Sequence, residues 1–195
     1  CGALGANTTG EVNTAVGTAS MVTNTTGFGN TALGKNSLYT NNGNNNTAVG
    51  HEALELNTSG ANNVAVGRQA LEANTTADNN TAIGYQSLLA NTTGTQNVSV
   101  GSISSVTNTT GCYNTALGHA SLYNNSTGCY NTALGNFAGN DNTTANNNTS
   151  VGYFALKANT TGAGNVAVGR DSLKANTTAN DNVALGYTAL CVNTT

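Results

Sequence analysis

The stretch that decides the fold is "GCYNTALGHASLYNNSTGCYNTALG", residues 111–135. Its segment "GCYNTALG" returns letter for letter after 17 residues, and a cysteine returns with it. A copy of this length indicates internal duplication, so the period of the repeat has to be established before any motif is interpreted.

The repeat extends from this stretch to both ends of the chain. A pentad of Asn, Thr or Val, Ala or Ser, an aliphatic residue and Gly begins at Asn13, Asn30, Asn46, Asn63, Asn80, Asn97, Asn114, Asn131, Asn148, Asn165 and Asn182. The spacing is 17 residues, apart from one step of 16 residues between Asn30 and Asn46. Counted from this Asn as position 1, position 5 is always Gly, position 8 is Ala or Ser, position 9 is nearly always Leu, and position 12 is Asn. The register runs from Cys1 to Thr195 and predicts one repeat domain over residues 1–195, without caps. The uncapped ends indicate either end-to-end stacking into a filament or a piece of a longer repeat protein.

Composition supports an ordered repeat over a conventional globule. Asn and Thr make up 35 and 33 of the 195 residues, Pro and Trp are missing, and only 7% of the residues are charged. The aliphatic residues are too few for a large mixed core, and low complexity also suits a disordered chain. Disordered chains are usually rich in charge or proline, however, and strict spacing needs a structural cause, so the sequence favours order.

Seventeen residues are too few for a paired-helix repeat and suit one turn of a β-solenoid. We therefore predict an all-β fold, a β-solenoid (β-roll) of about twelve turns. Each pentad is expected to form a short strand that ends at a Gly corner. Positions 6–11, as in "RQALEAN", contain good helix formers, so the sequence leaves open a short helical turn or a second strand in each repeat.

The alternation of a strand assigns the faces of the pentad. Positions 2 and 4 lie on one side and position 3 on the other. Because position 4 is always aliphatic, we expect it to face the core with the Leu of position 9, and the small residue at position 3 to face outward. Ser105 and Gly139 interrupt the Leu column and mark thin points of the core. The Asn residues at positions 1 and 12 are expected to form stacked side-chain amide ladders.

The four cysteines fall into two pairs. Cys112 and Cys129 share position 16 in successive turns, about 5 Å apart, which predicts an intrachain disulfide. Cys1 and Cys191 lie in the first and last turns, on the order of 50 Å apart, and are expected to link stacked subunits. A lipid anchor on Cys1, or free thiols, are the alternatives. Disulfides point to an oxidising, extracellular setting, and no cysteine or histidine cluster indicates a metal site.

A second pattern predicts N-glycosylation. The sequon Asn-x-Ser/Thr holds at position 12 in Asn7, Asn24, Asn57, Asn74, Asn91, Asn108, Asn125, Asn142, Asn159, Asn176 and Asn193. The Asn at position 1, by contrast, is nearly always followed by Thr-Ala or Val-Ala, which is no acceptor. The alternative is that "NTT" is turn chemistry and that duplication copies any triplet.

The pentads "NTAVG", "NTAIG" and "NTALG" carry a resemblance to known groups. Residues 80–94, "NTAIGYQSLLANTTG", resemble the repeats of phage tail-fibre-like and environmental surface fibre proteins, and the pentads are similar to strands in the β-roll heads of trimeric autotransporter adhesins. The resemblance implies an extracellular fibre. The turn is longer than in the adhesin heads, and neither a coiled-coil stalk nor a membrane anchor follows in the sequence, so trimerisation and anchoring stay open.

The titratable residues argue against an enzyme. Eight acidic residues, five basic residues and two histidines provide no acid–base pair, nucleophile triad or phosphate-binding loop, and no cofactor is expected. A net charge of −3 also argues against nucleic acid as a partner. No apolar run approaches transmembrane length, so no membrane insertion is expected.

We expect a structural subunit of an extracellular, N-glycosylated fibril that stacks end to end, with its own copies and covalent glycans as partners. Two alternatives remain. One is an adhesin that binds carbohydrate or another surface, or a tail-fibre shaft segment, with Tyr39, Tyr85, Tyr153 and Tyr187 as contacts. The other is an ice-binding protein that uses the Thr residues of position 2.

Overall fold

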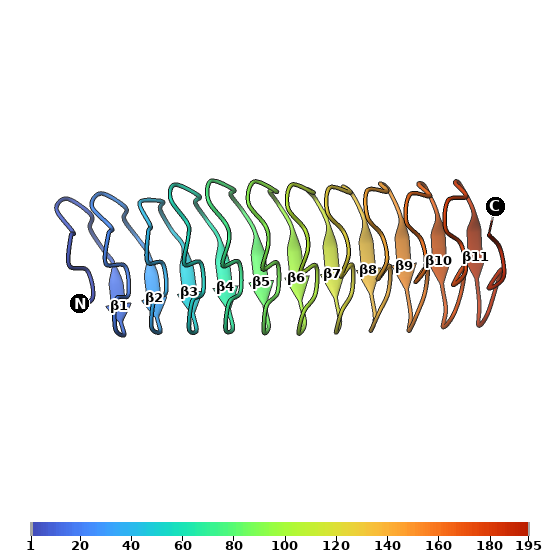
Figure 1. The fold of residues 1–195 in the computed structure, drawn as a ribbon, viewed down its shortest axis with the longest axis horizontal. Helices are drawn as coiled ribbons and strands as arrows, with labels where there is room; N and C mark the ends of the chain where they lie inside the picture. Colours follow the sequence, from blue (N-terminus) through green and yellow to red (C-terminus); the bar gives the residue numbers. More distant parts are fainter. Residues whose placement is uncertain (1, 195) are drawn as a thin grey trace.

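A computed structural model describes residues 2–194 of the chain as a long stack of turns, with the two termini at opposite ends (Figure 1). Positions 2–4 of each pentad form a strand: β1 (Thr14–Val16), β2 (Thr31–Leu33), β3 (Thr47–Val49), β4 (Val64–Val66), β5 (Thr81–Ile83), β6 (Val98–Val100), β7 (Thr115–Leu117), β8 (Thr132–Leu134), β9 (Thr149–Val151), β10 (Val166–Val168) and β11 (Val183–Leu185). All eleven form one parallel sheet in chain order, and each strand pairs position for position with the next. The predicted all-β parallel solenoid with 17-residue spacing is confirmed.

The structure corrects two details of that prediction. About ten turns join β1 to β11, fewer than the twelve expected, and residues 2–194 contain no helix. Positions 7 and 9 both have left-handed backbone angles, such as φ 52° at Ala120 and 47° at Leu122. Because left-handed residues alternate with the other residues over positions 7–9, this segment does not coil into a helix. Its N–H groups instead point to the neighbouring turn. The Leu122 N–H, for example, donates to the carbonyl oxygen of Ala138 at 3.0 Å.

The predicted faces of the strand were wrong. Position 3 faces the interior, where Ala116 and Ala133 are fully buried, whereas position 4 faces outward, where Leu117 and Leu185 are 49% and 78% exposed. The rod is so narrow that its interior side of the strand has room only for a methyl or hydroxymethyl group. The restriction of position 3 to Ala or Ser is therefore the signature of the core, and the freer choice at position 4 marks the surface.

The core consists of three stacked columns at positions 3, 8 and 9. Leu54, Leu71 and Leu173 of position 9 are fully buried between the small residues of the other two columns. At Gly139, where this column lacks a side chain, an added Cβ would lie 3.1 Å from Leu122 Cδ2. The side chain of Leu122 from the preceding turn therefore occupies part of the space that the missing Leu leaves.

The predicted amide ladders are present at both Asn positions. At position 1, Asn114 Nδ2 donates to Asn97 Oδ1 at 3.1 Å and to the carbonyl oxygen of Gly128 at 2.8 Å. At position 12, Asn108 Nδ2 donates to Asn91 Oδ1 at 2.9 Å and to the carbonyl oxygen of Gly111 at 3.0 Å. Hydrogen bonds of this kind repeat along the rod, so two rows of mostly buried amides tie each turn to its neighbours.

Three glutamates on two adjacent turns make the stability of the rod depend on pH. Burial, followed by repulsion from Glu52 and Glu55, raises the pKa of Glu72 above its ordinary 4.5. The folded state thus binds this proton more tightly than the unfolded state, so Glu72 destabilises the fold at neutral pH and ceases to do so as the pH falls through its folded pKa and below 4.5. We expect Glu72→Gln to raise the melting temperature at pH 7, with the gain disappearing near pH 4.

Circular dichroism melts of both proteins over this pH range measure the difference directly. Asp171 is the internal contrast, because a hydrogen bond from Lys174 lowers the pKa of its carboxyl below 3.8. Its contribution is therefore present above 3.8 and is lost only in more acidic solution. A melting temperature of Glu72→Gln equal to that of the wild type at pH 7 would contradict the assignment.

Candidate functional site

The outward side of the sheet is an uncharged band along the whole rod. In all eleven strands position 2 is Thr or Val and position 4 is Val, Leu or Ile, and every charged residue lies at another position of the repeat. Apolar side chains in the band are well exposed, including Ile83 at 39%, Val98 at 41% and Leu117 at 49%. With strands about 4.8 Å apart, the band is about 50 Å long. Apolar surfaces of this extent are typical of contact sites.

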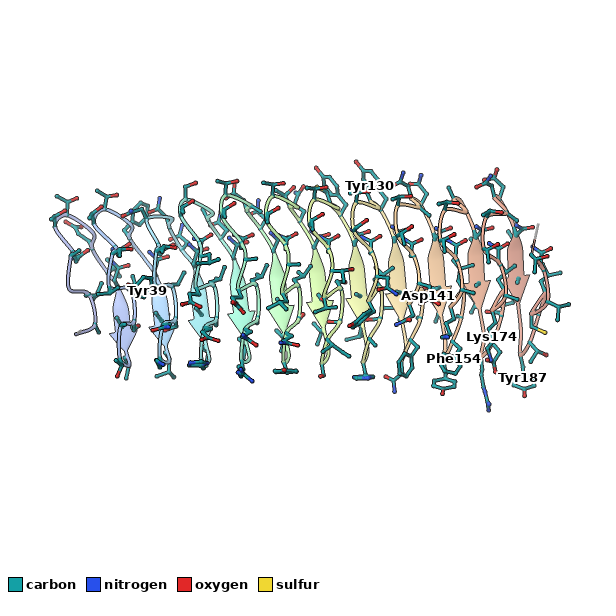
Figure 2. The ribbon with its side chains drawn as sticks, viewed as in Figure 1. Tyr39, Tyr130, Asp141, Phe154, Lys174 and Tyr187 are labelled. Carbon is teal, nitrogen blue, oxygen red and sulfur yellow. The ribbon has the colours of Figure 1, made fainter. Side chains whose placement is uncertain are left out.

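The two long edges of this strand face carry opposite charge. Position 6, just after the strand, contains Lys35, Arg68 and Arg170 and no acidic residue. Positions 16 and 17, just before it, contain Glu11, Asp78 and Asp181 and no basic residue. Figure 2 shows the two edges on opposite sides of the rod, with Tyr130 of position 17 at one and Tyr187 of position 6 at the other. The strand face is therefore an uncharged band between a basic edge and an acidic edge, although one of the three cations, Arg170, is paired with Asp171 at 3.1 Å.

Cations and aromatic rings alternate near the C-terminal end of the basic edge. The guanidinium of Arg170 lies 5.8 Å from the ring centre of Tyr153 and 5.7 Å from that of Tyr187. Tyr85, another predicted contact residue, is exposed on the same edge. Tyr39 stands apart, half-buried at position 10. The structure thus brings Tyr153 and Tyr187 into one row and leaves the other two tyrosines outside it.

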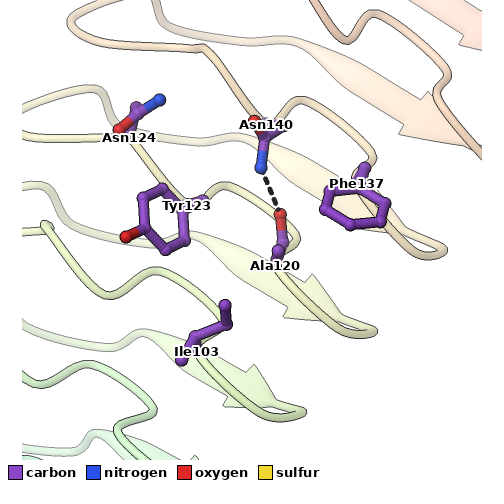
Figure 3. A pocket seen from close by; sticks show the side chains of 6 residues that line it. All are labelled: Ile103, Ala120, Tyr123, Asn124, Phe137 and Asn140. Carbon is purple, nitrogen blue, oxygen red and sulfur yellow. Dashed lines mark hydrogen bonds between the residues drawn. The ribbon is translucent and has the colours of Figure 1, made fainter.

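A hollow opens on the side of the rod formed by positions 6–11 (Figure 3). Its volume is about 290 Å³, and its lining residues are Ile103, Ala120, Tyr123, Asn124, Phe137 and Asn140, from three successive turns. It exists because Ala120 occupies position 7, where nearby turns have longer residues such as Gln86 and Phe137. This site was not predicted from the sequence. The sequence feature that could have indicated it is the short side chain of Ala120 at position 7, in the middle of the chain.

The predicted glycosylation column lies almost entirely inside the rod. All its members between the first and the last are buried: Asn24, Asn57, Asn74, Asn91, Asn108, Asn125, Asn142, Asn159 and Asn176. The nitrogen that would carry a glycan instead donates two hydrogen bonds, as in Asn125 Nδ2 to Asn108 Oδ1 at 2.8 Å and to the carbonyl oxygen of Gly128 at 3.0 Å. These nine side chains therefore have a structural role in the folded rod, and their N-glycosylation stays a prediction. Only Asn7 and Asn193, at the two ends, are less enclosed.

The predicted disulfide between Cys112 and Cys129 is not formed, and both thiols are free. The sulfur of Cys129 accepts a hydrogen bond from the Cys112 N–H at 3.1 Å, and that of Cys112 accepts one from the Thr95 N–H at 3.4 Å. In another turn, Asn146 Oδ1 takes the same role. The sulfurs therefore act as acceptors within the column. Cys191 is also free, and Cys1 lies outside the described residues.

Residues 2–194 contain no cluster of three or more His, Cys, Asp or Glu side chains arranged for a metal ion. The same part of the chain has no helix of the length and hydropathy that a membrane crossing needs. Comparison with protein-family models, with curated proteins and with solved structures finds no match to this chain.

Proposed function

We propose that the chain is a structural subunit of an extracellular fibre, in which the rod continues by end-to-end stacking of turns. The observation that carries the proposal is the repeated hydrogen bonding of the Asn ladder. The Asn side-chain oxygen of each turn accepts hydrogen bonds from the Asn of the next turn. Asn182 binds Asn165 Oδ1 through its backbone N–H and its Nδ2, both at 3.0 Å. A turn placed beyond β11 would find Asn182 Oδ1 in the same relation.

The opposite end of the stack supports the same proposal. Within residues 2–194, β1 pairs only with β2 and β11 only with β10, so the outer edge of each of these two strands is unpaired in this part of the chain. Open strand edges are templates for further pairing. Turns from a second copy, or further turns of the same chain, would extend the ladders without new chemistry. A disulfide between Cys1 and Cys191 of successive subunits remains a prediction, and the extracellular location rests on the resemblance to surface fibre repeats.

The charged edges favour side-by-side contact between parallel rods. A second rod turned to face the first, with the same axial direction, brings its acidic edge against the basic edge of its neighbour. A reversed rod would place like charges together, which is unfavourable. The shared strand face is about 50 Å by 10 Å, so a contact would bury about 1,000 Å² in total, near the lower limit for specific interfaces. Such a contact suits a fibre in which it repeats many times.

The outward strand face also favours a second candidate, an ice-binding protein. Thr14, Thr31, Thr47, Thr81, Thr115, Thr132 and Thr149 of position 2 lie on the outer side of the sheet, regularly spaced by the stacking of strands. Val64, Val98, Val166 and Val183 interrupt this row. Thermal hysteresis of the purified chain is the readout that separates this candidate from the fibre.

Small-angle X-ray scattering over a concentration series tests the fibre. We expect particle length to grow with concentration, and the cross-section to grow as rods pair. The double variant Ile83→Lys and Leu117→Lys places charge on two outward residues and should abolish the growth in cross-section while length still increases. The matched control, Thr93→Lys and Thr110→Lys, changes exposed residues of position 14 and should behave as the wild type.

Two results would contradict the proposal. Single rods of constant length at all concentrations, in the oxidised as well as the reduced protein, would exclude end-to-end stacking. Constant length together with thermal hysteresis would establish the second candidate instead. Growth in length without any growth in cross-section would leave the fibre standing and remove the side-by-side contact.

A further inference from the structure

We propose that the hollow around Ala120 is a binding site for one neutral sugar ring. This inference goes beyond the fibre and does not depend on it. The site would allow an otherwise uniform rod to recognise a glycan at one place along its length.

The shape of the hollow suits a single ring. Ala120 forms the floor, Ile103 closes one end, and the rings of Tyr123 and Phe137 stand on either side (Figure 3). The volume of about 290 Å³ lies at the lower end of the range of about 300–1,000 Å³ for small-molecule sites. The site is open to solvent along the rod, so a ring at the end or within a longer glycan could enter it.

The Phe137 wall and the Asn140 amide of the hollow are held in place by contacts with the protein. The ring of Phe137 packs edge-on against His119 and tilted against Phe154, with ring centres 5.3 Å apart in both pairs. Asn140 Nδ2 donates to the carbonyl oxygen of Ala120 at 2.9 Å, which fixes the orientation of this amide. Side chains fixed in this way lose little entropy when a ligand binds, so even a small contact area can give measurable affinity.

The polar groups of the lining favour a ligand that donates hydrogen bonds. Asn124 Nδ2 donates to Asp141 Oδ1 at 3.2 Å, so the nitrogens of both lining amides are engaged. Within residues 2–194, no protein group hydrogen-bonds to Asn124 Oδ1, Asn140 Oδ1 or the Tyr123 hydroxyl. Two amide oxygens of the lining are therefore left to accept from hydroxyl groups of a ligand, whereas the Tyr123 hydroxyl points away from Ala120 (Figure 3).

Apolar ring faces next to hydroxyl acceptors match the two sides of a sugar ring, which has C–H groups on its faces and hydroxyls at its rim. The surroundings disfavour charged ligands. None of the six lining residues is charged, so a charged group of either sign would be buried in the hollow without a contacting partner of opposite charge. The carboxylate of Asp141, beside Asn124, would in addition repel an anion. A neutral polyhydroxylated ring fits both conditions.

The hollow is an interruption of the repeat rather than a property of every turn. Elsewhere the side chains of positions 7 and 10 interact across this surface, as in Asn36 Nδ2 to Glu55 Oε1 at 3.1 Å and Lys174 Nζ to Asp171 Oδ1 at 2.9 Å. This difference supplies the variant for a test. Gln is the residue of position 7 at Gln69 and Gln86, and Gln86 has φ 53° where Ala120 has 52°, so Ala120→Gln fills the hollow with a side chain that the repeat already accepts.

Saturation-transfer NMR with the methyl glycosides of glucose, galactose, mannose and N-acetylglucosamine tests the site. We expect saturation of the ring protons of at least one probe, with a dissociation constant on the order of 1 mM. Ala120→Gln should weaken this binding at least tenfold, whereas Thr110→Gln, an exposed residue on another side of the rod, should leave it unchanged. Circular dichroism melts confirm that both variants fold.

If Ala120→Gln does not fold, a second variant of the hollow tests the same proposal. Tyr123→Leu removes the ring and the hydroxyl, and Leu89 occupies the same position in another turn, so the fold should tolerate it and binding should again weaken. The proposal is overturned if no neutral glycoside shows saturation transfer, if binding survives in both variants, or if tetramethylammonium or methyl phosphate binds in place of the sugars.

Discussion

Replacing Asn108 by alanine is expected to lower the free energy of unfolding by about 3–5 kcal/mol. The side chain is buried and joins three turns: Nδ2 donates to Asn91 Oδ1 at 2.9 Å and to the carbonyl oxygen of Gly111 at 3.0 Å, and Oδ1 accepts from Asn125 Nδ2 at 2.8 Å. The substitution removes three buried hydrogen bonds and leaves Asn91 Oδ1 without a partner, at about 1–3 kcal/mol for that group. The Gly111 carbonyl oxygen keeps its bond from Asn97 Nδ2 and Asn125 Nδ2 keeps its bond to the Gly128 carbonyl oxygen, so the other two losses should cost about 1 kcal/mol each. Denaturant unfolding followed by circular dichroism measures the loss.

Asn136→Ala is the matched control for this variant. Asn136 is exposed at position 6, and its side chain accepts one hydrogen bond, from the His119 N–H at 3.2 Å. Removal of one exposed hydrogen bond should cost about 1 kcal/mol or less. Equal losses in the two variants would mean that the buried amide ladder stabilises the rod no more than a surface contact does.

The second large effect is expected at the Gly of position 5. In Gly101→Ala, the new Cβ would overlap the carbonyl oxygen of Gly118 and lie 2.6 Å from its carbonyl carbon, both of them backbone atoms. The residue also has φ 142°, a conformation that favours glycine. Strain and overlap together should destabilise the rod by about 4 kcal/mol or more, measured by the same denaturant unfolding.

Gly94→Ala separates backbone conformation from crowding. An added Cβ at Gly94 would also be crowded, with Asn91 Oδ1 at 2.5 Å, but Gly94 has no left-handed φ. Ala77, Ala145 and Ala179 occupy the same position 15 in other turns, so small shifts of the backbone accommodate a methyl group there. The expected loss is about 1 kcal/mol. A loss as large as that of Gly101→Ala would show that the positive φ is not the cause.

The period and the ladders could be predicted from the sequence because they follow from spacing alone. A 17-residue repeat with one Gly corner and two constant Asn positions leaves few ways to stack the chain. The faces of the strand could not be predicted by ranking residues for hydrophobicity. At Ala116 and Leu117, the larger aliphatic residue lies outside because the interior has no room for it. Restriction of size was a better guide to burial than apolar character.

The structural role of the sequon column could not be predicted from the triplets, for a related reason. A sequon is a local triplet, whereas the burial of Asn125 results from neighbouring turns that close over it. The constancy of Asn at position 12 already had a structural explanation in the amide ladder. The disulfide prediction relied on the spacing of turns and did not include the direction of the side chains, which point each sulfur at a backbone N–H.

The hollow around Ala120 was beyond local pattern analysis. It depends on a short side chain between long neighbours from two other turns, Ile103 and Phe137. Only the register of the folded stack places these residues side by side. Once the register is known, a scan of position 7 for short residues in the middle of the rod identifies the site.

Electron cryo-microscopy of filaments grown from the purified chain shows whether the turns continue from one subunit to the next. We predict a continuous rod with rungs about 4.8 Å apart along the filament axis, the Ala residues of position 3 inside and the aliphatic residues of position 4 outside. Separate rods that never join, or filaments whose strands are not perpendicular to the axis, would contradict end-to-end stacking.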